Sequence, residues 1–315
     1  KSPAPARPSK DNSVNPRGMK EWVDRHPSEL RPLAESIGKN ITRVRQDEFE
    51  EALEETFLDF KSKVEGRPYV IVMGDQPYKS NEWTYLLAME KGLDAPAPIV
   101  NPYDIQRWLL ENSDVKDVMY IDDASYSGRQ IETHLDLMGM PSSGDGQFPE
   151  GVQMHLVVPF MTRHAAELMK NKYRNVSVSQ HRTVLSVEDI IKQGGIKSSD
   201  VSLLKRAYGL NEETLKENGL TYFAHKIPDM SSVPGAEATS IFDGVVVDVQ
   251  GNKIGQMPFI PKTVPPYKEQ MLAEVFSPVD ERIGARGNGQ GAREITAGSP
   301  MARETGRRFR NYESI

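Results

Sequence analysis

Apolar and polar positions follow two different spacings along this chain. Over Gln46–Val64 the apolar residues recur at helical spacing while Glu and Lys occupy the other face, which predicts an amphipathic helix. The apolar residues of that helix are Phe49, Leu53, Phe57 and Phe60. Before it, residues 19–39 hold helical fragments that are broken at Pro27 and Pro32.

Farther along, short apolar runs alternate with helical patterns. Runs of strand length cover residues 69–73, 99–100, 118–122, 153–159, 176–179 and 220–226. Helical patterns cover residues 80–91, 103–111 and 162–172, another ends near 138, and short helices are expected within 186–219. This alternation predicts an α/β fold whose mostly parallel sheet is covered by helices on both faces.

Composition predicts four segments. Residues 1–17 are rich in Pro, Ser, Ala and Arg and are expected to form a disordered leader, and 18–66 an N-terminal helical extension. The α/β domain is expected over residues 67–270. A flexible basic tail is expected over 271–315, because residues 281–315 carry six glycines and seven arginines with few large apolar residues.

The composition also excludes several classes of site and partner. No apolar run approaches the length of about 18 residues that a membrane span needs, so we expect a soluble, cytoplasmic protein without a membrane partner. The chain has no cysteine, which removes disulfides, thiolate metal sites and cysteine nucleophiles, and leaves export without disulfides open. The net charge of −6 argues against a nucleic-acid partner.

One predicted strand ends in the adjacent carboxylates of Asp122 and Asp123, and a short turn and a helix follow. Ligands of open parallel sheets bind at the carboxyl ends of strands. A turn before a helix directs several backbone N–H groups towards one point, which suits an anion. Ser125 and Ser127 add hydroxyl donors, and Gly128 permits close backbone approach. The carboxylates suit the hydroxyls of a sugar phosphate, or Mg²⁺ bound directly or through water.

The segment VMYIDDASYSGRQ resembles the phosphoribosyl-pyrophosphate motif of type I phosphoribosyltransferases. That motif has four apolar residues, two acidic residues, a few small residues and then a Thr-Thr-Gly-x-Thr turn or a variant of it. The resemblance implies that Asp122 and Asp123 are catalytic, hold the ribose 2′- and 3′-hydroxyls and bind Mg²⁺. It assigns the 5′-phosphate to a loop of Ser125, Tyr126, Ser127, Gly128, Arg129 and Gln130.

The same resemblance points to two further loops and to a variable hood over the base. In the family, the loop after the first core strand binds pyrophosphate. Here that loop contains Gly74, Asp75 and Gln76, with Lys79 as a catalytic contact to pyrophosphate. The segment HKIPDMSS is similar to the late Ile-Pro-Asp loop of the hypoxanthine-guanine branch, which implies base-binding roles for Lys226 and Asp229. The alternative interpretation makes both segments ordinary structural loops.

Two positions depart from the family pattern and keep two functions open. Tyr126 stands where the turn has its first threonine, and where the purine-salvage branch has an aspartate base, and Gln130 replaces the closing threonine. A tyrosine with a pKa of about 10 is too weak a base to replace that aspartate unaided. The first hypothesis is an enzyme that transfers or cleaves a phosphoribosyl group with Mg²⁺. The second is a non-catalytic nucleotide-binding regulator or secreted bacterial effector that meets a protein partner through its tails or N-terminal helices.

Other chemistries find less support in the sequence. Phosphatases of the HAD type space their two aspartates by one residue, whereas the pair here is adjacent. The six histidines show no zinc-binding spacing, and a serine nucleophile elbow is missing. His134 and Asp136, on the helix after the motif, are predicted to be surface residues, and His155, within a strand, a satisfied core residue.

Overall fold

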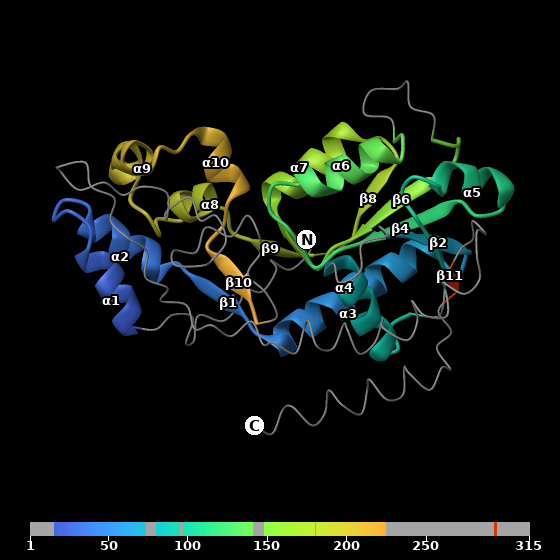
Figure 1. Ribbon diagram of the computed structural model, residues 1–315, viewed down its shortest axis with the longest axis horizontal. Coiled ribbons are helices and arrows are strands. Elements are labelled where there is room, and N and C mark those ends of the chain that lie inside the picture. Colours follow the sequence, from blue (N-terminus) through green and yellow to red (C-terminus); the bar gives the residue numbers. More distant parts are fainter. Residues whose placement is uncertain are drawn as a thin grey trace, which may run out of the picture.

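The computed structural model describes residues 16–73, 80–94, 97–140, 148–179, 181–224 and 293–294. The predicted fold class is confirmed, because a mostly parallel sheet carries helices on both faces (Figure 1). In order across the sheet, its strands are β11 (Arg293–Glu294), β3 (Pro98–Val100), β2 (Tyr69–Val72), β4 (Asp117–Ile121), β6 (Gln153–Val157) and β8 (Val176–Val178). All neighbouring pairs are parallel except β11 with β3.

The order of the parallel strands reverses once. Numbered along the chain, they lie in the order 2-1-3-4-5, so the chain first adds β3 on one side of β2 and then β4, β6 and β8 on the other. In such doubly wound sheets the loops on either side of the reversal diverge and leave room for a ligand. That point lies between the carboxyl ends of β2 and β4.

The first face of the sheet is covered by α3 (Gln46–Val64) and α4 (Ser80–Glu90). The predicted bounds of α3 are confirmed, and all four of its predicted apolar residues are buried. They pack with Trp83 of α4 and with Met119 and Ile121 of β4. Because side chains alternate along a strand, Val118 and Tyr120 of the same strand point to the opposite face.

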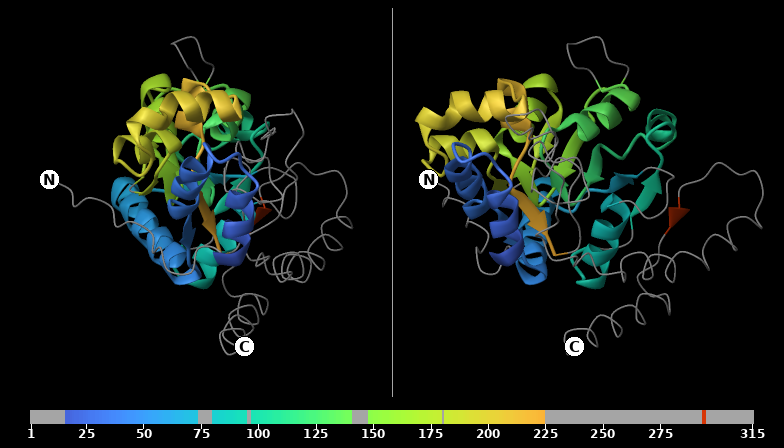
Figure 2. Two further views of the ribbon diagram at one scale, coloured as in Figure 1. Left: turned by 90° about the vertical axis from the view of Figure 1, so that its left-hand side faces the viewer. Right: turned by 60° about the vertical axis from the view of Figure 1, so that its left-hand side comes forward.

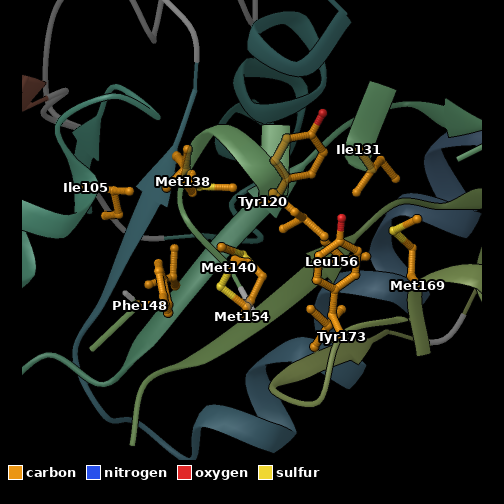
Figure 3. Packing of buried hydrophobic residues seen from close by; sticks show 14 of the residues in the cluster. Ile105, Tyr120, Ile131, Met138, Met140, Phe148, Met154, Leu156, Met169 and Tyr173 are labelled. Atoms are coloured by element: carbon orange, nitrogen blue, oxygen red, sulfur yellow. The ribbon is translucent and has the colours of Figure 1, made fainter. Parts of the chain in front are cut away.

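The second face is covered by α5 (Ile105–Glu111), α6 (Arg129–Leu137) and α7 (Arg163–Lys172). Figure 3 shows the core beneath them, where Ile131 of α6 and Met169 of α7 meet Tyr120 and Leu156 of the sheet. A sheet buried on both faces needs strands that are apolar throughout, which explains the continuous apolar runs in the sequence.

Three strands continue beyond a short break at the carboxyl end of the sheet. These are β5 (Ala124–Ser125), β7 (Phe160–Thr162) and β9 (Arg182–Val184), which follow β4, β6 and β8 and pair in parallel in the same order. They were not predicted, because each is only two or three residues long and directly precedes or follows residues without a strand pattern. The helix predicted from residue 162 begins at Arg163, since Thr162 belongs to β7 and caps the helix by accepting a hydrogen bond from Ala165 N.

A helical lobe lies beside the sheet and is built from two segments that are far apart in the sequence (Figures 1 and 2). Its first part is α1 (Pro16–Asp24), α2 (Arg31–Lys39) and β1 (Thr42–Val44). Its second part is α8 (Val187–Lys192), the 3₁₀ helix η1 (Ser198–Asp200), α9 (Val201–Tyr208), α10 (Glu212–Glu217) and β10 (Thr221–Phe223). β1 pairs in parallel with β10, which fixes the two parts to each other.

The lobe has a hydrophobic core of its own. Trp22 and Ile37 of the N-terminal helices pack in one cluster with Ile190 and Leu204. The buried ring of His26 contributes a polar tie, because its Nε2 atom lies 3.0 Å from the hydroxyl of Tyr208. Residues predicted as a separate N-terminal extension therefore share a core with a segment more than 150 residues later, while the division of the chain into domains stays a prediction.

A buried charged group lies at the amino end of the sheet. Arg67 holds Asp117 through its Nε and Nη2 atoms at 2.8 and 3.2 Å, and His155 Nε2 lies 2.8 Å from the same carboxylate. The prediction that His155 is a satisfied core residue is confirmed for Nε2, whereas its Nδ1 atom has no hydrogen-bond partner among the described residues.

No helix in the described ranges is both long enough and apolar enough to cross a membrane.

Candidate functional site

The acidic pair lies at the reversal in strand order. Asp122 and Asp123 follow the last residue of β4 and occupy the break before β5. Both are buried, with 3% and 0% of their surface exposed. The backbone N–H of Asp122 donates to the carbonyl of Val157 on β6, so the pair is held to the sheet even where the strand is interrupted. The sequence prediction of an acidic pair at the carboxyl end of a central strand is confirmed in its position.

Two helix N-termini converge on Asp122. Its Oδ1 atom accepts a hydrogen bond of 2.7 Å from Ser80 Oγ, and Ser80 is the first residue of α4. Its Oδ2 atom lies 3.3 Å from the side-chain amide of Gln130, the second residue of α6. A residue in the first turn of each helix therefore contacts this carboxylate, and negative charge is favoured near a helix N-terminus.

Asp123 is held by the backbone of the next residue. Its Oδ1 atom accepts a hydrogen bond of 2.7 Å from the backbone N–H of Ala124. Burial raises the pKa of Tyr126 well above its ordinary value, and the nearby charge of Asp123 raises it further. Burial does the same to Tyr120, with Asp122 as the next cause. Both phenols are therefore neutral near neutral pH.

The turn after the pair is shorter than the sequence suggests. Ser125 belongs to β5, so the turn proper consists of Tyr126, Ser127 and Gly128. Ser125 and Ser127 are both buried. Gly128 has a φ of +79° and is the N-cap of α6, and a Cβ atom there would lie 3.2 Å from Met169 Cε and 3.5 Å from the Cα atom of Ala165 on α7. The positive φ favours glycine, and a Cβ atom would also press on the Met169 and Leu168 side chains of α7.

Tyr126 faces the helical lobe. Its hydroxyl donates a hydrogen bond of 2.7 Å to the carbonyl of Thr221, and its own carbonyl accepts from Thr162 Oγ1. Its ring lies against Gly219, where an added Cβ atom would come within 2.8 Å of Tyr126 Cε1. The side chain is thus a structural contact in this arrangement, and its backbone is the part that belongs to the turn.

Arg129 also faces the lobe, whereas Gln130 faces the acidic pair. The guanidinium of Arg129 contacts Glu213 and Glu217 of α10, at 2.9 and 3.1 Å. The backbone N–H of Arg129 donates to Ser127 Oγ at 3.3 Å, which joins the turn to the first helical residue. Among the predicted phosphate-binding residues, Gln130 therefore makes a direct side-chain contact with the acidic pair, whereas the side chains of Tyr126 and Arg129 contact the lobe.

His134 makes a contact beside the site that was not predicted from the sequence. It was predicted as a surface residue, but it is half-buried, and its Nδ1 atom lies 2.8 Å from the hydroxyl of Tyr120. Tyr120 is two residues before Asp122 and therefore on the same side of the strand. Gln130 and His134 are four residues apart on α6, so they lie on the same face of the helix, and that face contacts Asp122 and Tyr120. This spacing in the sequence could have predicted that His134 lies beside the site.

The remaining predicted residues lie outside the described part of the chain. These are Gly74, Asp75, Gln76 and Lys79, which follow β2, and Lys226 and Asp229, which follow β10. Their proposed roles stay predictions. Ser80, the first described residue after the first group, contacts Asp122.

Asp122 and Asp123 are the candidate protein ligands for Mg²⁺. The described residues contain no group of three or more His, Asp or Glu side chains that could hold a metal ion. Mg²⁺ beside a phosphorylated ligand commonly takes only one or two protein carboxylates, with ligand oxygens and water completing its shell. Asp122 and Asp123 fit that pattern, because they offer two adjacent carboxylates at the carboxyl end of one strand.

Comparison with known proteins gives one slight similarity. No protein-family profile matches the chain, and no curated protein matches it either. A similar solved structure is the orotate phosphoribosyltransferase from Aeropyrum pernix, at 18% identity and a TM-score of 0.30 over 49% of this chain and 79% of that one. A similarity this low assigns neither a family nor an activity to this chain.

Proposed function

We propose that this protein binds phosphoribosyl pyrophosphate, or a related ribose 5-phosphate ligand, with Mg²⁺ and transfers or cleaves the phosphoribosyl group. The observation that carries the proposal is the position of Asp122 and Asp123 at the strand-order reversal, with the N-termini of α4 and α6 converging on Asp122. Ribose hydroxyls are donors that buried carboxylates accept well, and a helix N-terminus suits a phosphate.

The 5′-phosphate is assigned to the loop of Ser125, Tyr126, Ser127, Gly128, Arg129 and Gln130. Support comes from the backbone of this loop. The carbonyl of Tyr126 is already hydrogen-bonded to Thr162, so it does not oppose an anion, and Gly128 begins α6 in the left-handed conformation. Consecutive N–H groups at such a start form an anion site. In this assignment Tyr126 and Arg129 contribute backbone rather than side-chain groups.

The leaving group is assigned to the loop between β2 and α4. Gly74, Asp75 and Gln76 would bind pyrophosphate, and Lys79 would compensate its charge. Mg²⁺, held by the acidic pair, would supply further charge stabilisation when bound. Lys226 and Asp229, after β10, would meet the base, and the helical lobe would serve as the expected hood. The acidic pair, the turn and the loop would act by orienting the ligand and by stabilising charge that develops at the leaving group.

The second candidate function is ligand binding without turnover. The placement of Tyr126 favours it, because the hydroxyl that would have to replace a catalytic aspartate is buried and donates to Thr221. Burial also raises the pKa of this phenol, so it is a poor base near neutral pH. Such a protein would use the same pocket residues to sense a nucleotide-like ligand and would act through a protein partner.

Isothermal titration calorimetry with phosphoribosyl pyrophosphate and Mg²⁺ tests both functions. The wild-type protein should bind, and the double variant Asp122→Asn/Asp123→Asn should not. The matched control is Glu111→Gln/Asp114→Asn, which removes two exposed carboxylates near the opposite end of β4 and should bind like the wild type. Absence of binding to the wild type would reject both functions.

A turnover assay then separates the two functions. Pyrophosphate release should be measured across a panel of bases and amines. Release that depends on one acceptor supports transfer, and release without any acceptor supports cleavage. Binding without release supports the non-catalytic alternative.

A further inference from the structure

Two side chains of the proposed phosphate loop bind the helical lobe. We propose that Tyr126 and Arg129 are positioning residues that couple ligand binding at residues 125–130 to the docking of this lobe. The ligand in this inference is the one assigned under the proposed function. The coupling itself rests on contacts between the loop and the segment 213–221.

The first contact is buried and uncharged. Tyr126 donates its hydroxyl proton to the carbonyl of Thr221, the first residue of β10, at 2.7 Å. Its ring fills the space beside Gly219, and no larger residue fits there, because a Cβ atom would lie 2.8 Å from the ring and 3.0 Å from the carbonyl of Leu185. A close-packed contact of this kind has one good arrangement, so a shift of the lobe must move the backbone of the loop.

The second contact is a two-point ion pair between Arg129 and Glu217. Arg129 Nε and Nη2 meet the two carboxylate oxygens of Glu217, each at 3.1 Å, and Nη2 also meets Glu213 at 2.9 Å. Glu217 is buried, with 6% of its surface exposed, so its charge depends on partners such as Arg129. The two-point geometry fixes the direction of α10 as well as its distance from the loop.

The lobe receives both contacts on one short segment. Glu213 and Glu217 lie in α10, Thr221 is the first residue of β10, and Gly219 lies between the two elements. Backbone hydrogen bonds stiffen this segment, since Val187 N donates to the carbonyl of Asn218 beside a bridge between residues 186 and 219. A displacement of the loop is therefore passed to α8 and α10 together.

Reciprocity follows from these contacts. If the ligand prefers the loop geometry seen with the lobe docked, ligand binding must stabilise docking, and docking must raise affinity by the same factor. Neither side chain has to touch the ligand for this effect. A residue that only stabilised the fold would behave differently. Its replacement would lower ligand affinity no more than the replacement of a comparable buried contact elsewhere in the protein.

Hydrogen exchange with ribose 5-phosphate as the probe tests the coupling. In the wild type, the ligand should slow exchange at residues 213–222 as well as at the loop. In Arg129→Met and in Glu217→Gln, the same lobe amides should exchange faster without ligand, and ligand should no longer protect them. Affinity should fall about fivefold or more, which is the low end of coupling between sites.

Arg67→Met is the matched control. Arg67 also uses Nε and Nη2 to hold a buried carboxylate, that of Asp117, and its side chain is exposed to a similar extent, 51% against 60% for Arg129. It lies at the amino end of β4, away from the lobe contact. This variant should lose stability but keep full ligand-dependent protection of residues 213–222.

Two outcomes would overturn the coupling. One is ligand protection of residues 213–222 that is equal in the wild type, in Arg129→Met and in Glu217→Gln. The other is found without ligand: Glu217→Gln, a change in the lobe, should speed exchange at residues 125–130, and an unchanged rate there would reject the coupling. If the wild type binds neither ribose 5-phosphate nor phosphoribosyl pyrophosphate with Mg²⁺, the proposed function is rejected and the ligand-free measurement alone decides the coupling.

Discussion

Ser80 Oγ lies 2.7 Å from Asp122 Oδ1, and this hydrogen bond joins the first residue of α4 to the carboxylate that follows β4. The two residues flank the point where strand order reverses. Asp122 is almost fully buried, so the hydrogen bonds it accepts decide how well its charge is tolerated. The Ser80 hydroxyl therefore supports both the fold and the proposed ribose site.

Replacement of Ser80 by alanine should destabilise the protein. The variant removes a hydrogen bond to a charged, buried acceptor, and such bonds contribute about 1.5–3 kcal/mol. Urea denaturation would measure the loss in the free energy of unfolding. Ser62→Ala is the control, because its hydroxyl donates to the carbonyl of Asp59 on the exposed side of α3. Equal effects of the two variants would contradict the importance of the Ser80 contact.

Gly128→Ala should cost more stability than an alanine at an open glycine. Gly128 and Gly92 both have positive φ, at +79° and +69°, so each variant carries a left-handed strain of about 1–2 kcal/mol. Only the Cβ atom at residue 128 meets neighbours, at 3.2 Å from Met169 and 3.3 Å from Leu168. Thermal unfolding of both variants would measure the difference. A cost at residue 128 no larger than at 92 would show that α7 gives way freely.

Tyr126→Phe should destabilise the fold by about 0.5–1.5 kcal/mol, the usual contribution of a hydrogen bond. The variant removes the donor to Thr221 and keeps the ring against Gly219. Tyr103→Phe is the control, since Tyr103 is 74% exposed. Chemical denaturation should show no measurable change for the control. A Tyr126→Phe variant as stable as the wild type would mean that the hydroxyl contact contributes nothing.

His155 should make stability depend on pH. Burial lowers its pKa below the ordinary value of 6.5, although the Asp117 carboxylate pulls it upwards. The unfolded chain therefore takes up a proton near pH 6.5 that the folded chain resists. The free energy of unfolding is then complete above about pH 6.5 and falls as the pH drops towards the folded pKa.

The test is urea denaturation of the wild type and of His155→Gln at about pH 7.5 and about pH 5.5, on either side of the ordinary histidine pKa. The variant should lose less stability on acidification than the wild type does. Asp117 affects the free energy of unfolding in a lower pH range. Burial raises its pKa, but hydrogen bonds from Arg67 and His155 outweigh burial, so its contribution is lost only below about pH 4. An identical pH dependence in both proteins would contradict the assignment to His155.

The sheet could be predicted because its signal is local and repeated. A continuous apolar run such as β4 predicts a strand that is buried on both faces, and the amphipathic pattern of α3 fixes that helix to the residue. The acidic pair was found for the same reason, since it directly follows such a run. Strands β5, β7 and β9 were not predicted, because two or three residues are too few to show a repeating pattern of apolar and polar positions.

The contacts of the site with the lobe could not be predicted from the sequence. Tyr126 and Thr221 are 95 residues apart, and no sequence pattern around either residue predicts a contact with the other. Arg129 was assigned to a phosphate on sequence grounds, and its alternative partners on α10 became visible only in three dimensions. Long-range side-chain pairs depend on how elements pack, which a single sequence does not encode in any local pattern.

A crystal structure of the protein with phosphoribosyl pyrophosphate and Mg²⁺ tests the central claim most directly. We expect a phosphate against the backbone of residues 125–130, with the ribose 2′- and 3′-hydroxyls bonded to Asp122 and Asp123. A ligand bound elsewhere on the protein, with no contact to Asp122 or Asp123, would contradict it.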